Sequence, residues 1–214
     1  GQMGGFGGSG TVTQGTSANT ITEDGTYSGE FLSSGDDENA LRVDGAEASL
    51  QDVSVKKTGG ASSNTEDGDF YGMNAALLAT NGAQVEITGA EITSDAQNGN
   101  GVFSYGEGTT VTISDSTVTT SADNSGGIQT TGGGTTVAAN LTVNTSGNSS
   151  AAIRSDRGGG TVRVTGGSYT SNGLNSPAVY STADISVSDA ELTANHSEAL
   201  VIEGQNSIAL ENCK

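Results

Sequence analysis

The stretch "SSAAIRSDRGGGTVRVTGGSYTS", residues 149–171, holds three short segments in which apolar and polar residues alternate. The segments are AAIRS (151–155), VRV (162–164) and SYTS (168–171), and glycine-rich turns separate them. Alternation with a period of two is typical of β-strands, and glycine next to Ser and Asp favours tight turns. The stretch therefore predicts three short strands within one structural unit.

The same unit recurs along the chain, about every 22–26 residues. Its first segment returns as ALLAT (76–80), GVFSY (101–105), GIQTT (127–131), PAVYS (177–181) and ALVIE (199–203). We align VAA (137–139) with VTI (111–113) and VRV as second segments. The residues expected to anchor the core from the first segments are Leu78, Phe103, Ile128, Ile153, Val179 and Val201.

One such unit cannot bury its own apolar face, whereas stacked units can. The sequence therefore predicts an all-β protein, a right-handed single-stranded parallel β-helix with three short strands per coil. Residues 1–10, GQMGGFGGSG, are expected to be a flexible linker. Residues 11–214 are expected to form the β-helix, with an irregular first coil over 11–38.

The last residues, IALENCK (208–214), end after the second strand of a coil. We therefore expect a truncated chain with an open C-terminal end. An open end of this kind invites contact with another copy, end to end, or with a C-terminal domain.

The chain carries a formal charge of −18, which argues against nucleic acid as a partner. It has one histidine, His196, and one cysteine, Cys213, so a histidine-dependent triad and an internal disulfide are not expected. No apolar run is long enough to span a bilayer. We expect no cofactor. Two acidic loops leave Ca²⁺ open, because oxygen ligands suit it, with solvated loops as the alternative; their carboxylates are Asp36, Asp37, Asp67 and Asp69.

The strings SSAAIRSDRGGGT, SPAVYSTADISV, EALVIEGQNSIALENC and DENALRVDGAEASLQDVSV resemble secreted or wall-attached β-helix proteins of Gram-positive, often gut-dwelling, bacteria. Such proteins are commonly labelled adhesin-like or carbohydrate-binding. The resemblance covers residues 37–214 in order. It implies an extracellular location, secreted or attached to the cell wall, and no particular reaction.

Three of the seven Lys and Arg residues of the chain, Arg154, Arg157 and Arg163, fall within the opening stretch. If Ile153 points inward, alternation turns Arg154 outward. Stacking then predicts one outward row of Ser104, Gln129, Arg154, Tyr180 and Ile202, with Asp156, Arg157, Glu203 and Tyr105 close by.

An aromatic ring, guanidinium groups, an amide and carboxylates suit a sugar, since rings stack on C–H groups and planar polar groups bind hydroxyls. Arg157 is a candidate partner for a uronate. We therefore expect a non-catalytic, adhesin-like module that contacts a polysaccharide or a host or bacterial surface glycan. The residues proposed to bind it are Gln129, Arg154, Asp156, Arg157, Tyr180, Glu203 and Tyr105.

Two alternatives stay open. One is a polysaccharide lyase or glycoside hydrolase that uses the same strip, with Arg154 as base, or with Asp156 and Glu203 as the carboxylate pair. The other is a purely structural stalk in which the arginines form ordinary ion pairs. The insertion at 58–73 is the longest departure from the repeat, and its Phe70 and Tyr71 make it a candidate lid or side wall of the strip.

Overall fold

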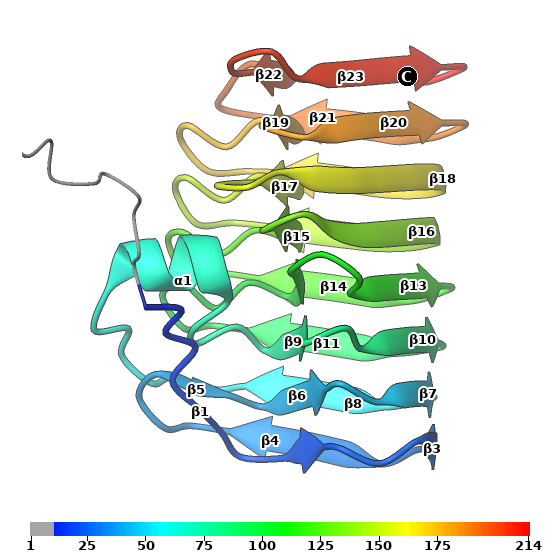
Figure 1. Cartoon of the computed structure of the whole chain (residues 1–214). Helices are drawn as coiled ribbons and strands as arrows, with labels where there is room; N and C mark the ends of the chain where they lie inside the picture. The colour runs from blue at the N-terminus through cyan, green and yellow to red at the C-terminus, as the bar shows by residue number, and fades with distance from the viewer. Residues whose placement is uncertain (1–10) are drawn as a thin grey trace, which may run out of the picture.

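The computed structural model describes residues 11–214, which form a right-handed parallel β-helix of about eight turns (Figure 1). The predicted fold class is confirmed. The linker expected at residues 1–10 lies outside the described residues.

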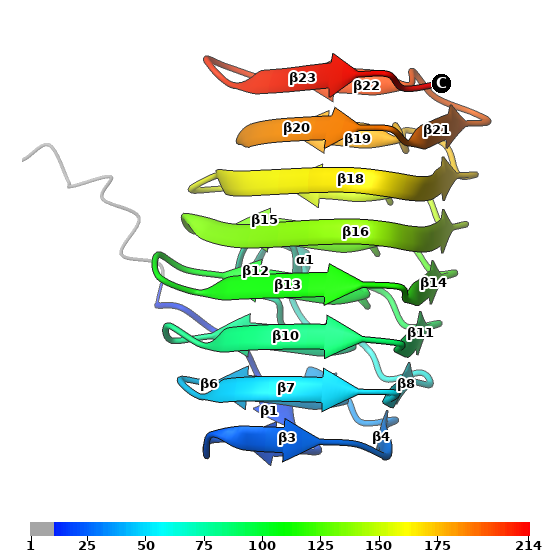
Figure 2. The ribbon, with the colours of Figure 1, turned by 90° about the vertical axis from the view of Figure 1, so that its right-hand side faces the viewer.

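The coils contribute strands to three stacked faces, and the last coil contributes only to the first two (Figures 1 and 2). The first sheet holds β2 (Thr20–Ile21), β6 (Leu41–Asp44), β9 (Leu77–Thr80), β12 (Val102–Tyr105), β15 (Ile128–Thr131), β17 (Ile153–Ser155), β19 (Val179–Ser181) and β22 (Leu200–Ile202). The second face holds β3 (Gly25–Tyr27), β7 (Glu47–Gln51), β10 (Gln84–Thr88), β13 (Thr110–Ser114), β16 (Gly134–Thr145), β18 (Gly160–Ser171), β20 (Asp184–Ser188) and β23 (Ser207–Glu211). The third face holds β4 (Glu30–Ser33), β8 (Ser54–Lys57), β11 (Glu91–Ser94), β14 (Thr117–Thr120), the ends of β16 and β18, and β21 (Glu191–Ala194). A separate pair joins β1 (Thr16–Ser17) to β5 (Glu38–Asn39).

The bend between the second and third faces falls at residues with a positive φ. These residues are Asp52, Gly89, Asp115, Asn140, the pair Gly166 and Gly167, and Asp189. Left-handed backbone suits Gly, Asn and Asp best among the residues. The repeated Gly, Asn and Asp of the sequence are therefore the corners of the coils.

The core is one continuous apolar cluster along the axis of the coils. On the first sheet its inward residues include Leu77, Val102, Ile128, Ile153 and Val179, which occupy one register position. The expectation that Leu78, Phe103 and Val201 anchor this core is wrong. They lie one residue further along, on the outward row, because alternation sends neighbours to opposite sides.

The second segment of the fifth coil is also shifted by one residue from the predicted alignment. Thr136 pairs with Val111, and Ala138 pairs with Ile113, so Val137 points outward and is 37% exposed. Thr136 is buried, and its hydroxyl pairs with the hydroxyl of Thr130 at 2.7 Å. A satisfied hydroxyl pair thus takes the place of an apolar residue in this coil.

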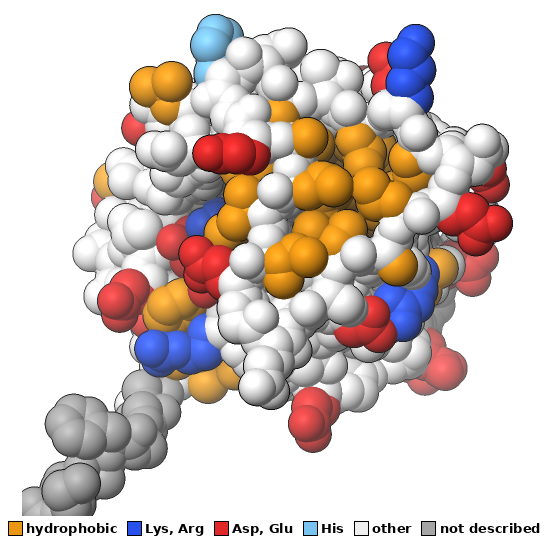
Figure 3. Space-filling view, turned by 90° about the horizontal axis from the view of Figure 1, so that it is seen from above, with side chains coloured by type: hydrophobic (Ala, Val, Ile, Leu, Met, Phe, Trp, Pro, Cys, Tyr) orange, Lys and Arg blue, Asp and Glu red, His pale blue; other side chains and the backbone are white. Residues whose placement is uncertain are grey.

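The first coil pairs in parallel with the second on all three faces, through β2 with β6, β3 with β7, and β4 with β8. At the other end, the last coil leaves Leu200, Ile202 and Leu210 exposed. Figure 3 looks onto this end and shows hydrophobic side chains gathered over the centre of the stack. An end-to-end or C-terminal-domain contact stays a prediction.

The insertion between the second and third coils contains a short helix, α1 (Thr65–Tyr71), which the sequence analysis did not predict. Asn64 caps its first turn by accepting a hydrogen bond from the Asp67 amide, and Gly72 ends it in a left-handed conformation. The helix lies outside the coils, on the far side of the stack from the second face (Figure 2). No helix within residues 11–214 is long and apolar enough to cross a membrane.

Candidate functional site

The helix α1 packs on the outer face of the first sheet. Beneath it lies a small apolar cluster separate from the main core, built from Ala75, Leu78 and Phe103 with Tyr105 at its edge. Tyr71 of the helix meets Tyr105 edge to face, with ring centroids 5.6 Å apart. The displaced apolar residues of the outward row therefore form the platform on which the insertion folds.

Polar contacts join the C-terminal end of the helix to β15 and to the turn before β12. The Gln129 side chain donates to the backbone carbonyl of Asp69 at 3.1 Å, and the Thr131 hydroxyl donates to the carbonyl of Phe70. The Asn98 amide donates to the Asp69 carboxylate at 3.1 Å. Asp69 is thereby held over the row that contains Gln129.

Arg154 lies next to Gln129 in that row, with Tyr180 on its other side. Its side chain is largely buried, and the residue is 8% exposed. The Arg154 Nη2 atom lies 3.2 Å from the Asp69 carboxylate and 3.8 Å from that of Asp156. One buried guanidinium thus joins the helix to the turn that follows β17.

Within residues 11–214, four buried polar side-chain atoms have no hydrogen-bond partner: Asn98 Oδ1, Asn100 Nδ2, Gln129 Oε1 and Arg154 Nη1. Three of these four side chains use their other polar atoms to bind Asp69. The fourth, Asn100, accepts a hydrogen bond from the backbone N–H of Gly126, beside Arg154. Buried polar groups are normally satisfied by protein or water, so this concentration around Asp69 marks a place suited to a polar ligand or to water.

Burial dominates the electrostatics of the two carboxylates. The pKa of Asp69 is raised above its usual value because burial disfavours the charged form, and the nearby Arg154 only partly offsets this. The pKa of Asp156 is raised for the same reason, again against the pull of Arg154. Two carboxyls with raised pKa values therefore flank one guanidinium.

A pocket of about 300 Å³ opens at this cluster. Its charged and aromatic lining consists of Asp69, Arg154, Asp156 and Tyr180. The remaining lining comes from the turns of successive coils: Asn124, Ser149, Ala151, Asn175 and Pro177. We call this hollow the Arg154 pocket. It combines a positive group, two acceptor groups, a ring and a small apolar patch.

Tyr180 and Glu203 meet at one side of the pocket. The pKa of Tyr180 is raised first by burial and then by the neighbouring Glu203 carboxylate. Glu203 itself is exposed and is absent from the pocket lining. It therefore stands as a neighbour of Tyr180.

The structure brings Arg154, Asp156 and Tyr180 together in the pocket lining, as the sequence analysis expected, whereas the other predicted residues do not line the pocket. Gln129 is fully buried under α1, so the helix blocks it from direct contact with a ligand. The Arg157 guanidinium lies over the ring of Phe70, 4.4 Å from its centroid, and Arg157 is exposed and absent from the pocket lining. Tyr105 packs against Tyr71 under the helix and not in the pocket.

The predicted outward row needs one further correction. Gln129 pairs with Phe103 in place of Ser104, and Tyr180 pairs with Val201 in place of Ile202. The strand of each of these coils sits one residue out of the expected alignment. Over the five coils of the predicted row, the outward position is therefore apolar at Phe103 and Val201 and polar at Gln129, Arg154 and Tyr180.

Asp69 is the main residue of the site that sequence reasoning assigned elsewhere, as a calcium-ligand candidate in a loop. The signal for its true context was the string Asn64-Thr65-Glu66-Asp67, a helix-start pattern, followed by Gly72 as a helix stop. The turn residues Asn124, Ser149 and Asn175 were missed as well. Their positive φ values place them at equivalent corners of successive coils.

The other acidic side chains proposed for Ca²⁺ are engaged differently. Asp36 accepts a hydrogen bond from the Ala61 amide, and Asp37 accepts one from the Ser63 amide. Among residues 11–214 there is no group of three or more His, Cys, Asp or Glu side chains arranged to hold a metal ion.

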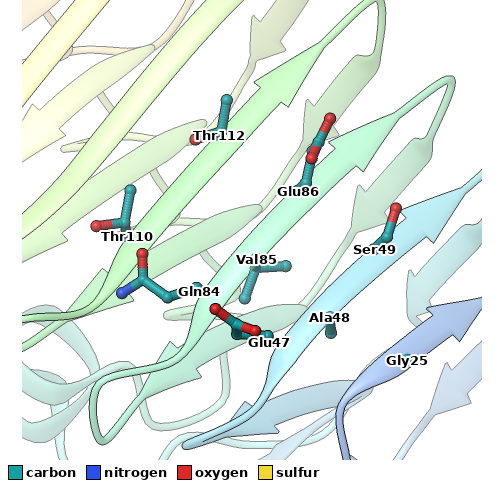
Figure 4. A pocket seen from close by; sticks show the side chains of 9 residues that line it. All are labelled: Gly25, Glu47, Ala48, Ser49, Gln84, Val85, Glu86, Thr110 and Thr112. Carbon is teal, nitrogen blue, oxygen red and sulfur yellow. The ribbon is translucent and has the colours of Figure 1, made fainter.

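A second hollow of about 350 Å³ lies over the outer face of β3, β7, β10 and β13 (Figure 4). Glu47 and Glu86 are its charged groups, and both are exposed. Of the four residues with an unpartnered buried atom, Arg154 lines the Arg154 pocket, and none lines this second hollow. We therefore assign the candidate site to the Arg154 pocket.

Comparisons of the chain with known proteins find no matching family model, no matching curated protein and no matching solved structure. The functional proposal therefore rests on the site and on the resemblance of the sequence to surface β-helix proteins.

Proposed function

We propose that this chain is a non-catalytic, adhesin-like module that contacts glycans through the Arg154 pocket. The observation that carries the proposal is the buried Arg154 guanidinium, held between Asp69 and Asp156 beside Tyr180 at the floor of a hollow. Sugar hydroxyls both donate and accept hydrogen bonds, and a charged guanidinium with two carboxylates offers both complements. The resemblance to surface β-helix proteins supports an extracellular location, secreted or wall-attached.

Contacts within the protein hold the Asp69 side of the pocket in place. The helix α1 is fixed by an apolar platform and by hydrogen bonds from two coils, so Asp69 is positioned before any ligand arrives. A site that is already ordered loses less conformational entropy on binding. The insertion therefore forms part of the pocket wall through Asp69.

The test is a glycan-array screen of the purified chain beside two variants, Arg154→Ala and Tyr180→Ala. Arg163→Met is the matched control, because Arg163 pairs with exposed Asp184 away from the pocket. The proposal expects binding that both pocket variants lose and the control keeps. Binding that survives both substitutions would place the contact elsewhere, and no binding to any glycan would favour a structural stalk.

A glycoside hydrolase is the second candidate, on one specific observation. Asp69 and Asp156 flank Arg154 in the same pocket, and both have raised pKa values, as a general acid requires. This pair replaces the Asp156 and Glu203 pair expected from the sequence. Release of reducing ends from the bound glycans, lost in Asp156→Asn, would establish hydrolysis; unchanged glycans after prolonged incubation would exclude it for those substrates.

A further inference from the structure

The charge balance of the Arg154 pocket disfavours an acidic sugar. Two carboxylates, Asp69 and Asp156, line it against the single guanidinium of Arg154. Arg157, the other nearby cation, is stacked on Phe70, and Glu203 adds a further negative charge beside Tyr180. A uronate carboxylate would meet more negative than positive charge, so the ligand that fits best carries no negative charge.

The hydrogen-bonding capacity of the pocket is more specific than its charge. Arg154 Nη1 is a buried donor without an acceptor among the described residues. A buried donor of this kind destabilises the protein, and an oxygen acceptor from a ligand would satisfy it. The carboxylates of Asp69 and Asp156 need the opposite, because ionised carboxylates only accept hydrogen bonds.

The same pocket offers a small apolar surface. Ala151 and Pro177 line it, and both are buried. A ligand group that fits all three features has a carbonyl oxygen for the guanidinium, an N–H for a carboxylate, and a methyl group for the apolar surface. An acetamido group has these three parts, and a plain sugar hydroxyl has no counterpart to the methyl group.

We propose that the Arg154 pocket binds the 2-acetamido group of an N-acetylated amino sugar. This inference rests on the proposed glycan-contacting function and names the class of sugar. The acetamido carbonyl accepts from Arg154, its N–H donates to Asp156 or Asp69, and its methyl lies against Ala151 and Pro177. The sugar ring lies toward Tyr180, and the volume of about 300 Å³ is at the lower end of ligand pockets, which suits a single ring.

The test is isothermal titration calorimetry of the full chain with four matched trisaccharides. They are the β-1,4 trimers of N-acetylglucosamine, of glucosamine and of glucose, and a galacturonate trimer. A glycan that ends in N-acetylgalactosamine serves as a further arm, to separate the two common sources of acetamido sugars. We expect at least tenfold tighter binding of the acetylated trimer than of the glucose trimer, and no binding of the uronate.

The outcomes separate the two proposals. Equal binding of the acetylated and glucose trimers would overturn the acetamido inference and leave the glycan-contacting function standing. Preference for the uronate would overturn the charge argument as well. Binding of none of these sugars, together with an empty glycan array, would overturn the proposed function itself. Tyr180→Ala, at a half-buried surface position, keeps the test usable if substitution of Arg154 prevents folding.

Discussion

The guanidinium of Arg154 on β17 lies 3.2 Å from the carboxylate of Asp69 on α1, so a strand of the sixth coil is tied to a helix inserted before the third. The contact spans coils that are not adjacent in the stack. It holds the helix in place, and the two residues that make it both line the Arg154 pocket.

Replacing Arg154 tests this contact. In Arg154→Met, Asp69 and Asp156 stay buried without their cation, so we expect a loss of about 3 kcal/mol in the free energy of unfolding at neutral pH. Urea denaturation followed by circular dichroism measures it. Arg163→Met removes an exposed pair with Asp184 and is expected to cost at most about 0.5 kcal/mol. Equal losses in both variants would contradict the account.

The same carboxyls give the stability a defined dependence on pH. Their pKa values are raised in the folded state, so the folded protein binds more protons than the unfolded chain does. Their contribution to stability therefore falls as pH rises from the ordinary aspartate pKa through the raised values, and it recovers on acidification. In Arg154→Met these pKa values rise further, so we expect its deficit to shrink between pH 7 and pH 4.5. A deficit that is constant or grows over this range would show that the carboxyls are not the cause.

Substitutions at two glycines distinguish the cost of backbone strain from the cost of disturbed packing beneath α1. Gly72 and Gly82 both have positive φ, but a Cβ on Gly72 would lie 2.6 Å from Leu78 Cδ1, whereas a Cβ on Gly82 would meet nothing within 4 Å. We expect Gly82→Ala to cost about 1 kcal/mol, from its left-handed backbone alone. Gly72→Ala should cost at least about 1 kcal/mol more, because it pushes the helix off its platform. Thermal unfolding of the two variants measures the difference, and equal costs would mean that the helix is not packed closely on Leu78.

The buried hydroxyl pair of the fifth coil tests the corrected register. Thr136→Val leaves the Thr130 hydroxyl buried without its partner, and we expect a cost of about 1–2 kcal/mol. Val137→Thr changes the neighbouring outward position and should alter stability by no more than about 0.5 kcal/mol. The opposite ranking in chemical denaturation would favour the register in which Val137 points inward.

The fold was predictable because the repeat is dense in local signals. Alternating apolar residues and the Asn, Asp and Gly at the corners recur in every coil, and each supports the same β-helix. The register was harder. In "ALLAT" two leucines are adjacent, and composition alone does not say whether Leu77 or Leu78 points inward; the helix that covers Leu78 decides it.

The site was predictable only in part, for a related reason. Stacking brought Arg154 and Tyr180 together correctly, because they are neighbours within one row. It could not place Asp69, since an insertion follows no repeat and its landing point depends on tertiary contacts. In the structure Gln129 contacts the Asp69 carbonyl and Arg157 contacts the Phe70 ring. Both partners come from that insertion, so the sequence alone assigns Gln129 and Arg157 to a ligand.

The most direct measurement is the binding of the full chain to a glycan array, compared with Tyr180→Ala and with the control Arg163→Met. The account predicts that the wild type and the control bind the same glycans and that Tyr180→Ala, while folded, loses them. Identical binding by all three proteins would contradict the central claim that the Arg154 pocket is the site.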